Sequence, residues 1–187
     1  MRGRDRKTLR LRGYDYTNAG YYFVTICVKE RKCLLGDHID NDVELSKIGE
    51  VARKCWLEIP VHFPKVSLDE FIIMPNHIHG IIIIHEMVDK KITGNKLVGN
   101  KNFCSLHRNE QIWQKRWGRS LSSVIRGFKI GVTSWCRQNH HEYFSWQKSF
   151  NDHIIRNERA LCNIREYISL NPFTWKEDEY FQNRKRK

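Results

Sequence analysis

The sequence lacks the features that mark membrane, secreted and nucleotide-hydrolysing proteins. No run approaches the ~18 apolar residues of a membrane-spanning helix, and no apolar stretch follows the charged N-terminus as in a signal peptide. Its six cysteines form no CxxC pair, which favours reduced, mostly buried thiols over a disulfide framework. The GxxxxGK[ST] loop that cradles nucleotide phosphates is also missing. We therefore expect a cytoplasmic protein without a membrane partner.

Acidic residues are few relative to basic ones. The 187 residues include 33 Lys+Arg but 21 Asp+Glu, which gives a net charge of +12. Such a surface attracts polyanions, nucleic acid above all, although charge does not distinguish DNA from RNA. The length suits a single domain. We expect that domain over residues 1–180, with a loop insertion rich in Lys, Asn and Gly at 88–119 and a basic tail at 181–187.

Residue patterning predicts an α+β fold. Aromatic and β-branched runs and turn residues predict the strands, and apolar residues at helical spacing predict the helices. The expected strands are a central one at 21–28, a short hairpin within 33–45, a pair at 66–74 and 77–85, and a short strand at 143–147. The expected helices run from Ser46 to Pro60, from Ser120 to 136, and over 158–170. This order indicates a ferredoxin-like or RRM-like antiparallel sheet with packed helices and an added C-terminal helix that carries Tyr167.

Two histidines in the 77–85 strand are candidate metal ligands. Residues two apart in a strand project from the same face, so His77 and His79 present two imidazoles together while Ile78 points into the packing. That spacing can hold one divalent cation. The alternative is a pair of ordinary histidines at an exposed strand start, with His85 further along in a structural role.

Tyr167 and Asn171 lie four residues apart, on one face of the last helix at its C-terminal end. A nucleophile and an oxygen ligand therefore converge there. The alternative is that Tyr167 is a half-buried packing residue and that Asn171 ends the helix before Pro172. The residues themselves leave both interpretations open.

The segment 74–80, Met-Pro-Asn-His-Ile-His-Gly, resembles the HUH motif of single-tyrosine transposases. Four more segments resemble the REP-associated tyrosine transposase branch of that family: 12–16, 23–27, 151–157 and 164–172. The resemblance implies that Mg²⁺ or Mn²⁺ is bound by His77, His79 and Asn171. It also implies that Tyr167 attacks single-stranded or hairpin DNA, forms a 5′-phosphotyrosine and acts in transposition or repeat mobilisation, as a monomer or a homodimer.

Other residues have less definite roles at this point. Tyr14, Tyr16, Tyr21 and Tyr22 belong to the opening segment and first strand, so Tyr143 is the better rival of Tyr167 as nucleophile. The basic residues expected to hold DNA are Arg126 and Lys129 on the polar face of the second helix and Lys115 and Arg116 between two tryptophans. Asp152 and His153 belong to the resemblance, but no role for them follows from the sequence.

The main competing interpretation is a non-catalytic DNA- or RNA-binding module, since ferredoxin-like sheets with exposed aromatic residues commonly bind RNA. Such a module predicts no metal dependence and no covalent adduct. A relaxase or replication initiator would use the same chemistry but would be expected to have a longer chain. An enzyme that cleaves repeats without moving itself is a further alternative.

Overall fold

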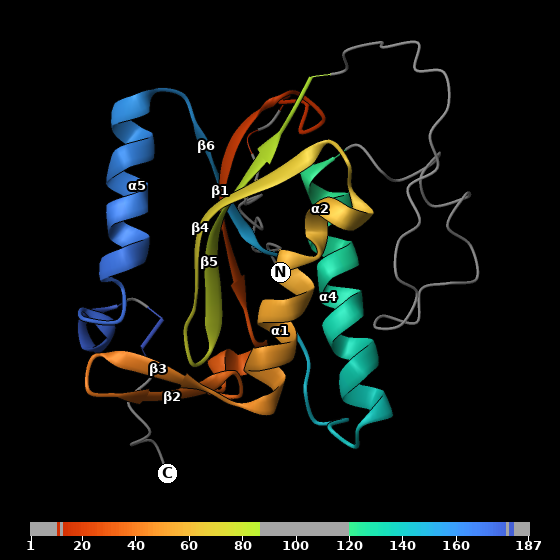
Figure 1. Ribbon diagram of the computed structural model, residues 1–187, viewed down its shortest axis with the longest axis vertical. Helices are drawn as coiled ribbons and strands as arrows, with labels where there is room; N and C mark the ends of the chain where they lie inside the picture. The colour runs from red at the N-terminus through yellow and green to blue at the C-terminus, as the bar shows by residue number, and fades with distance from the viewer. Residues whose placement is uncertain (1–10, 12, 87–119, 179, 182–187) are drawn as a thin grey trace, which may run out of the picture.

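The structure is a computed structural model that describes residues 11, 13–86, 120–178 and 180–181 (Figure 1). The strands are β1 (Gly20–Cys27), β2 (Gly36–Ile39), β3 (Asp42–Leu45), β4 (Val66–Ile73), β5 (His77–Ile84) and β6 (Asn151–Ile155). The helices are α1 (Lys47–Leu57), α2 (Ile59–His62), α4 (Leu121–Gln138) and α5 (Glu158–Leu170), with short 3-10 turns η1 (Lys29–Arg31) and η2 (Trp175–Glu177). None of the described helices is long and apolar enough to cross a membrane.

Four strands form an antiparallel sheet in the order β4-β5-β1-β6, and β2 and β3 form a separate hairpin. The first strand is central, as its aromatic and β-branched residues predict. It pairs with β5 from Gly20 opposite Ile84 to Cys27 opposite His77, and with β6 up to Thr25 opposite Asn151. The α+β, ferredoxin-like fold class expected from the sequence is therefore confirmed.

The sheet separates two apolar layers (Figure 1). On one face, α1 and α4 bury a large core in which Trp56 contacts the ring of Phe128 and inward-facing residues of β1 and β5 such as Ile78. On the other face, Leu161 and Ile168 of α5 pack in a smaller cluster with residues such as Ile81. Because alternate strand residues point to opposite faces, His77 and His79 lie on the α5 side of the sheet.

The helices begin where side-chain caps predict. Ser46, Ser120 and Asn157 each accept a hydrogen bond from the backbone N–H three residues further on, at the starts of α1, α4 and α5. Each such cap satisfies a donor that the first helical turn leaves unpaired and stabilises the helix by about 0.5–2 kcal/mol. The helix starts at Ser46 and Ser120 and the span of α5 are thus confirmed.

An ion pair holds α5 against the sheet. Arg165 donates two hydrogen bonds to Asp69, from Nε to Oδ1 at 3.0 Å and from a terminal nitrogen to Oδ2 at 2.6 Å. Asp69 lies in β4 where the pairing register with β5 shifts between Leu68 and Phe71. The guanidinium of Arg165 lowers the pKa of the Asp69 carboxyl. This bidentate contact fixes the helix that carries Tyr167.

Two of the sequence predictions for local structure are wrong. Residues 143–147 are not a strand of the sheet, because only Trp146 forms a bridge, with Val28, while the fourth strand is β6. Pro60 does not simply end a helix. It occupies the first turn of α2, where its missing N–H costs no hydrogen bond, so the chain bends and continues as a short second helix.

The structure places the two basic residues expected on the polar face of α4 differently. Lys129 does not project into solvent: its Nζ donates to the carbonyls of Gln147 and Ser149, at 2.8 and 2.9 Å. Burial lowers the pKa of Lys129 to about 8. Arg126 is exposed, as expected. The expected loop at 88–119, with Lys115 and Arg116, and the tail beyond residue 181 lie outside the described residues.

Candidate active site

Cross-strand neighbours on the α5 side of the sheet form a regular grid. His153 of β6 lies opposite Phe23 of β1, and one step further along β1, Thr25 lies between Asn151 and His79. Directly opposite residues in antiparallel strands have neighbouring side chains, so polar groups from three strands meet on one surface. Every one of these side chains is placed by backbone pairing, which makes the surface rigid.

His77 is buried and held in one orientation by its neighbour in the turn. Its Nδ1 donates a 2.8 Å hydrogen bond to Oδ1 of Asn76, whose own Nδ2 donates to the carbonyls of Arg31 and Tyr180. Because both carbonyls accept from Nδ2, the other amide atom must be the oxygen, and the proton of His77 is on Nδ1. Nε2 of His77 therefore carries a lone pair and faces the site.

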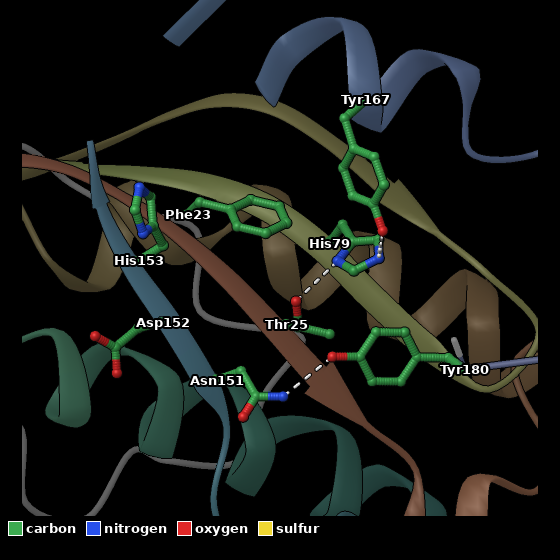
Figure 2. Close-up of a pocket in the computed structure, with 8 residues that line it drawn as sticks. All are labelled: Phe23, Thr25, His79, Asn151, Asp152, His153, Tyr167 and Tyr180. Atoms are coloured by element: carbon green, nitrogen blue, oxygen red, sulfur yellow. Dashed lines mark hydrogen bonds between the residues drawn. The ribbon is translucent and has the colours of Figure 1, made fainter. Parts of the chain in front are cut away.

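His79 is held in a similar way. Its Nδ1 lies 2.9 Å from the hydroxyl of Thr25, and its Nε2 lies 3.2 Å from the hydroxyl of Tyr167 (Figure 2). The ring of Phe23 stacks on the imidazole with the centroids 5.3 Å apart. Both histidines thus have an oriented Nδ1 and present Nε2 to the same space, the arrangement in which histidines bind metals.

Burial keeps both imidazoles neutral. His77 and His79 are 0% and 1% exposed. The loss of hydration lowers the pKa of His79 to about 4, although the negative charge of Asp178 acts in the opposite direction. The pKa of His77 is also lowered well below its usual value, by burial and by the positive charges that His79 and Arg31 would add. Neutral imidazole is the form that ligates a cation.

Asp178 is the third group of the cluster. One ligand atom from each of His77, His79 and Asp178 lies within 4.8 Å of the others, which is close enough for a single metal ion to contact all three. The carboxylate is oriented by two donors: Nδ2 of Asn171 reaches Oδ2 at 2.9 Å, and the backbone N–H of Tyr180 reaches Oδ1 at 2.6 Å.

Two buried polar atoms at this cluster lack a hydrogen-bond partner among the residues that the structure describes. They are Nε2 of His77 and Oδ1 of Asn171. A buried acceptor without a partner costs about 1–3 kcal/mol, so native proteins rarely retain one without a reason. A bound cation would satisfy such lone pairs, which makes these residues fit a metal site.

Tyr167 extends from the last turns of α5 toward His79 of this cluster, as Figure 2 shows. Its hydroxyl lies 3.2 Å from Nε2 of His79 and 3.5 Å from Oδ2 of Asp178. The side chain is 41% exposed, in contrast to the buried histidines. A phenol that is both beside the cluster and open to solvent can meet a substrate that arrives from outside.

Four of the five rival tyrosines lie elsewhere. Tyr14, Tyr16 and Tyr22 contact one another through their rings, and Tyr16 and Tyr22 belong to the core on the α4 side of the sheet. Tyr143 is exposed and its hydroxyl lies 3.0 Å from Nδ1 of His141. The structure thus places Tyr167, His77, His79 and Asn171 together, and none of these four rivals joins them.

The segment after α5 completes the site. It folds back so that Trp175 and Tyr180 pack on the His77 ring, with centroids 5.7 and 4.7 Å apart. The β2–β3 hairpin supports this turn, since Nε2 of His38 lies 2.7 Å from the carbonyl of Pro172. These contacts carry Asp178 to the histidines, eleven residues beyond Tyr167.

Sequence reasoning missed Asp178, Tyr180, Thr25 and the orienting role of Asn76. Thr25 alone had a usable signal, because two-residue spacing puts it on the same face of β1 as Phe23. Asp178 has no such signal: it follows a turn of irregular backbone. Asp152 belongs to the opposite face, since it pairs with the core residue Val24 and its side chain points away from the other site residues in Figure 2.

Of the basic residues proposed for DNA contact, the two that the structure describes, Arg126 and Lys129, do not join the cluster. Arg126 and Lys129 are on α4, which covers the other face of the sheet from Tyr167 (Figure 1). Their contribution to the chemistry of the cluster would have to be indirect.

No protein-family model matches the chain. The chain is 41% identical to an uncharacterized protein of Haemophilus influenzae over 176 residues, which covers 94% of this chain and 93% of that protein. It is also 26% identical, over 159 residues, to a protein of the same organism provisionally named a REP-associated tyrosine transposase, covering 84% of this chain and 73% of that protein.

Among solved structures, the fold is similar to that of a REP-associated tyrosine transposase bound to a REP hairpin. The TM-score is 0.57 at 20% sequence identity, with 89% of this chain and 73% of the other covered. At this identity the similarity concerns the fold, including the four-stranded antiparallel sheet and its packed helices.

Proposed function

We propose that this chain is a metal-dependent enzyme that cuts and rejoins single-stranded DNA. The premise is that the chain belongs to one family with the 41% identical Haemophilus influenzae protein and is related to the REP-associated tyrosine transposases. Tyr167 is the nucleophile of this proposal. The observation that carries it is the 3.2 Å approach of the Tyr167 hydroxyl to Nε2 of His79, within a cluster of three potential metal ligands.

His77 and His79 would hold the cation through Nε2, and Asp178 would hold it through a carboxylate oxygen. Asn171, expected as a ligand from the family resemblance, donates to Asp178 and leaves its own Oδ1 without a partner in the described part of the chain, so its amide can support the same ion. Two imidazoles with carboxylate and amide oxygens suit Mn²⁺, and oxygen ligands suit Mg²⁺. When bound, the cation supplies Lewis acidity that stabilises negative charge on the scissile phosphate.

The residues of the chain supply orientation. Asn76 and Thr25 fix the two imidazoles, and the Asp69–Arg165 pair fixes the helix of Tyr167, so the phenol and the ligands keep their relative positions before DNA binds. Such preorganisation lowers the entropic cost of bringing nucleophile and phosphate together. Solvent reaches the exposed Tyr167, so water can accept the phenol proton as the oxygen attacks.

The proposed step exchanges one phosphoester for another. A bond forms between Oη of Tyr167 and phosphorus, the bond to the 3′-oxygen of the preceding nucleotide breaks, and its electron pair and a proton from water give a free 3′-OH. The product is a 5′-phosphotyrosine. Attack of a 3′-OH on that phosphotyrosine restores the phenol and rejoins DNA without ATP, which agrees with the missing nucleotide-binding loop.

The substrate class follows from the relative rather than from this chain. The structurally similar transposase was solved with a REP hairpin. The net charge of +12 supports a polyanionic partner here. We propose single-stranded DNA next to a hairpin as the substrate, and transposition or repeat mobilisation as the process. The single domain over residues 1–180 is part of the same proposal.

A covalent-adduct assay tests the function. Wild-type protein and Tyr167→Phe are incubated with a panel of labelled single-stranded hairpin DNAs and Mn²⁺, and the products are separated on a denaturing gel. We expect a protein–DNA adduct with wild type and with the control Tyr143→Phe, and none with Tyr167→Phe. An adduct that persists in Tyr167→Phe would identify another nucleophile. Absence of any adduct across the panel would favour a non-catalytic binding module.

A further inference from the structure

A pocket of about 290 Å³ lies beside Tyr167, and the proposed chemistry gives it no role. The rings of Phe23, Tyr167 and Tyr180, the imidazole of His153 and the amide of Asn151 surround it (Figure 2). Thr25, His79 and Asp152 also contribute to its lining, although the carboxyl group of Asp152 points away from the other side chains in Figure 2. The pocket therefore combines several flat rings with a few polar groups.

The pocket exists because one part of the sheet face is not covered by a helix. The helix α5 packs mainly against β4, whereas the other end of the sheet is the edge strand β6. There His153 is exposed and Phe23, its cross-strand neighbour, is only partly buried. Thr25, a small residue, lies between the Phe23–His153 pair and the rings of His79 and Tyr180, so a hollow remains in the surface.

The position of the pocket limits what can enter it. It shares Tyr167 and His79 with the candidate active site. A phosphate at the Tyr167 hydroxyl would therefore bring the nucleotide attached to it directly to the pocket. Resting on the proposed function, we infer that this pocket binds one unpaired nucleobase of the nucleotide next to the scissile phosphate.

The lining suits a nucleobase better than a sugar or a second phosphate. Bases stack on aromatic and histidine rings on open antiparallel sheets, and Phe23 lies on the central strand of such a sheet. None of the described side chains that line the pocket is a lysine or an arginine, and one of them, Asp152, is acidic, so the pocket offers little to a phosphate. Nδ2 of Asn151 donates to the Tyr180 hydroxyl at 3.1 Å, which holds the amide at the wall where it can reach the polar edge of a base.

The test compares DNA with and without bases, in protein that cannot react. In a Tyr167→Phe background, binding is measured for 15-residue oligomers of dT, dA and dC and for an abasic oligomer with the same phosphates. Phe23→Leu removes the stacking ring and keeps an apolar side chain. Its matched control is Tyr21→Leu, because Tyr21 lies on the same face of β1, is 37% exposed and does not line the pocket.

Base stacking contributes roughly 5- to 150-fold in affinity per base. We expect Phe23→Leu to reduce the preference for base-containing over abasic DNA by at least about fivefold, and Tyr21→Leu to leave it unchanged. Affinity for the abasic oligomer should be the same in all three proteins. His153→Ala, at an exposed position that tolerates substitution, should reduce the preference in the same way, with the exposed His140→Ala as control.

An unchanged preference in both folded pocket variants would overturn the inference. The result is independent of catalysis. If wild type formed an adduct but the pocket variants kept the preference for base-containing DNA, the proposed function would stand and the inference about the pocket would fail. If the pocket variants lost the preference but no adduct formed with wild type, the inference would stand and the proposed function would fail. The pocket would then be a single-strand binding site on a protein that does not cleave.

Discussion

Asn171 donates a 2.9 Å hydrogen bond through Nδ2 to Oδ2 of Asp178. The two residues lie on either side of the turn that follows α5, and their contact brings the carboxylate to His77 and His79. The family resemblance implies Asn171 as the oxygen ligand, and that expectation stays a proposal beside the additional candidate ligand Asp178. In the structure Asp178 brings a charged oxygen to the cluster, and Asn171 orients it.

The first prediction concerns Asp178. Asp178→Asn keeps the size of the side chain but removes its charge, so we expect affinity for Mn²⁺ to fall at least about tenfold, measured by calorimetric titration. Glu177→Gln is the matched control, because Glu177 is the exposed carboxylate next to it. If Asp178→Asn bound Mn²⁺ normally while Asn171→Ala did not, Asn171 would be the third ligand instead.

A second prediction concerns the orientation of His77. Asn76→Ala removes the acceptor for Nδ1 of His77 and the two donor bonds that tie this turn to Arg31 and Tyr180. Loss of such outer-shell partners typically weakens metal binding by about 10- to 100-fold. We expect that loss of Mn²⁺ affinity in Asn76→Ala, together with slower adduct formation at saturating DNA. Unchanged Mn²⁺ affinity would show that His77 does not need Asn76.

Much of the fold could be predicted because the apolar pattern and the caps specify it locally. The hairpin of β4 and β5 follows from residue patterning on both sides of a turn. The whole of α5 follows from its apolar spacing and from the residues at its two ends. The strand β6 was missed because its polar start, Asn151, Asp152 and His153, lies at the sheet edge beside the pocket and does not alternate with apolar residues. The aromatic residues near Trp146 looked more like a strand, but they fill the core between β1 and α4.

The candidate site also divides into residues that the sequence predicts and residues that it does not. His77, His79, Tyr167 and Asn171 could be proposed because each sits at a regular spacing in a strand or a helix. Asp178 and Tyr180 could not, because an irregular turn brings them back by contacts with Asn76, His38 and the His77 ring. Contacts between residues so far apart in the chain produce no periodic pattern in a single sequence.

A third prediction follows from the buried imidazoles. In metal-free protein the unfolded chain takes up a proton on His79 near pH 6.5, whereas the folded chain does so only near pH 4. Stability therefore falls as the pH falls through this window, and His79 alone accounts for about 2 kcal/mol between pH 7 and pH 5. Urea unfolding in EDTA at several pH values measures this slope. We expect a smaller slope in His79→Gln, and an equal slope would count against the burial argument.

The fourth prediction concerns the ion pair between β4 and α5. Asp69→Asn removes the charge that receives both Arg165 bonds, so α5 should be held less firmly and adduct formation should slow. Mn²⁺ affinity should stay unchanged, since the histidines lie on β5. The lowered pKa of Asp69 means that the pair stabilises the fold at neutral pH and that this contribution is lost in acid, as the carboxyl protonates. Wild type and Asp69→Asn should therefore converge in stability at low pH; a constant difference would contradict this.

The last prediction separates two basic residues of α4 that the sequence treats alike. The ammonium of Lys129 is engaged by the carbonyls of Gln147 and Ser149, so Lys129→Met should cost about 1–3 kcal/mol of stability and leave the salt dependence of DNA binding unchanged. Arg126 is exposed and remains a proposed phosphate contact. Arg126→Ala should reduce the slope of log affinity against log salt by about 0.7–0.9, the value of one lost contact. If Lys129→Met alone reduced that slope, its two carbonyl contacts would have to open when DNA binds, and the face of α4 would belong to the DNA interface after all.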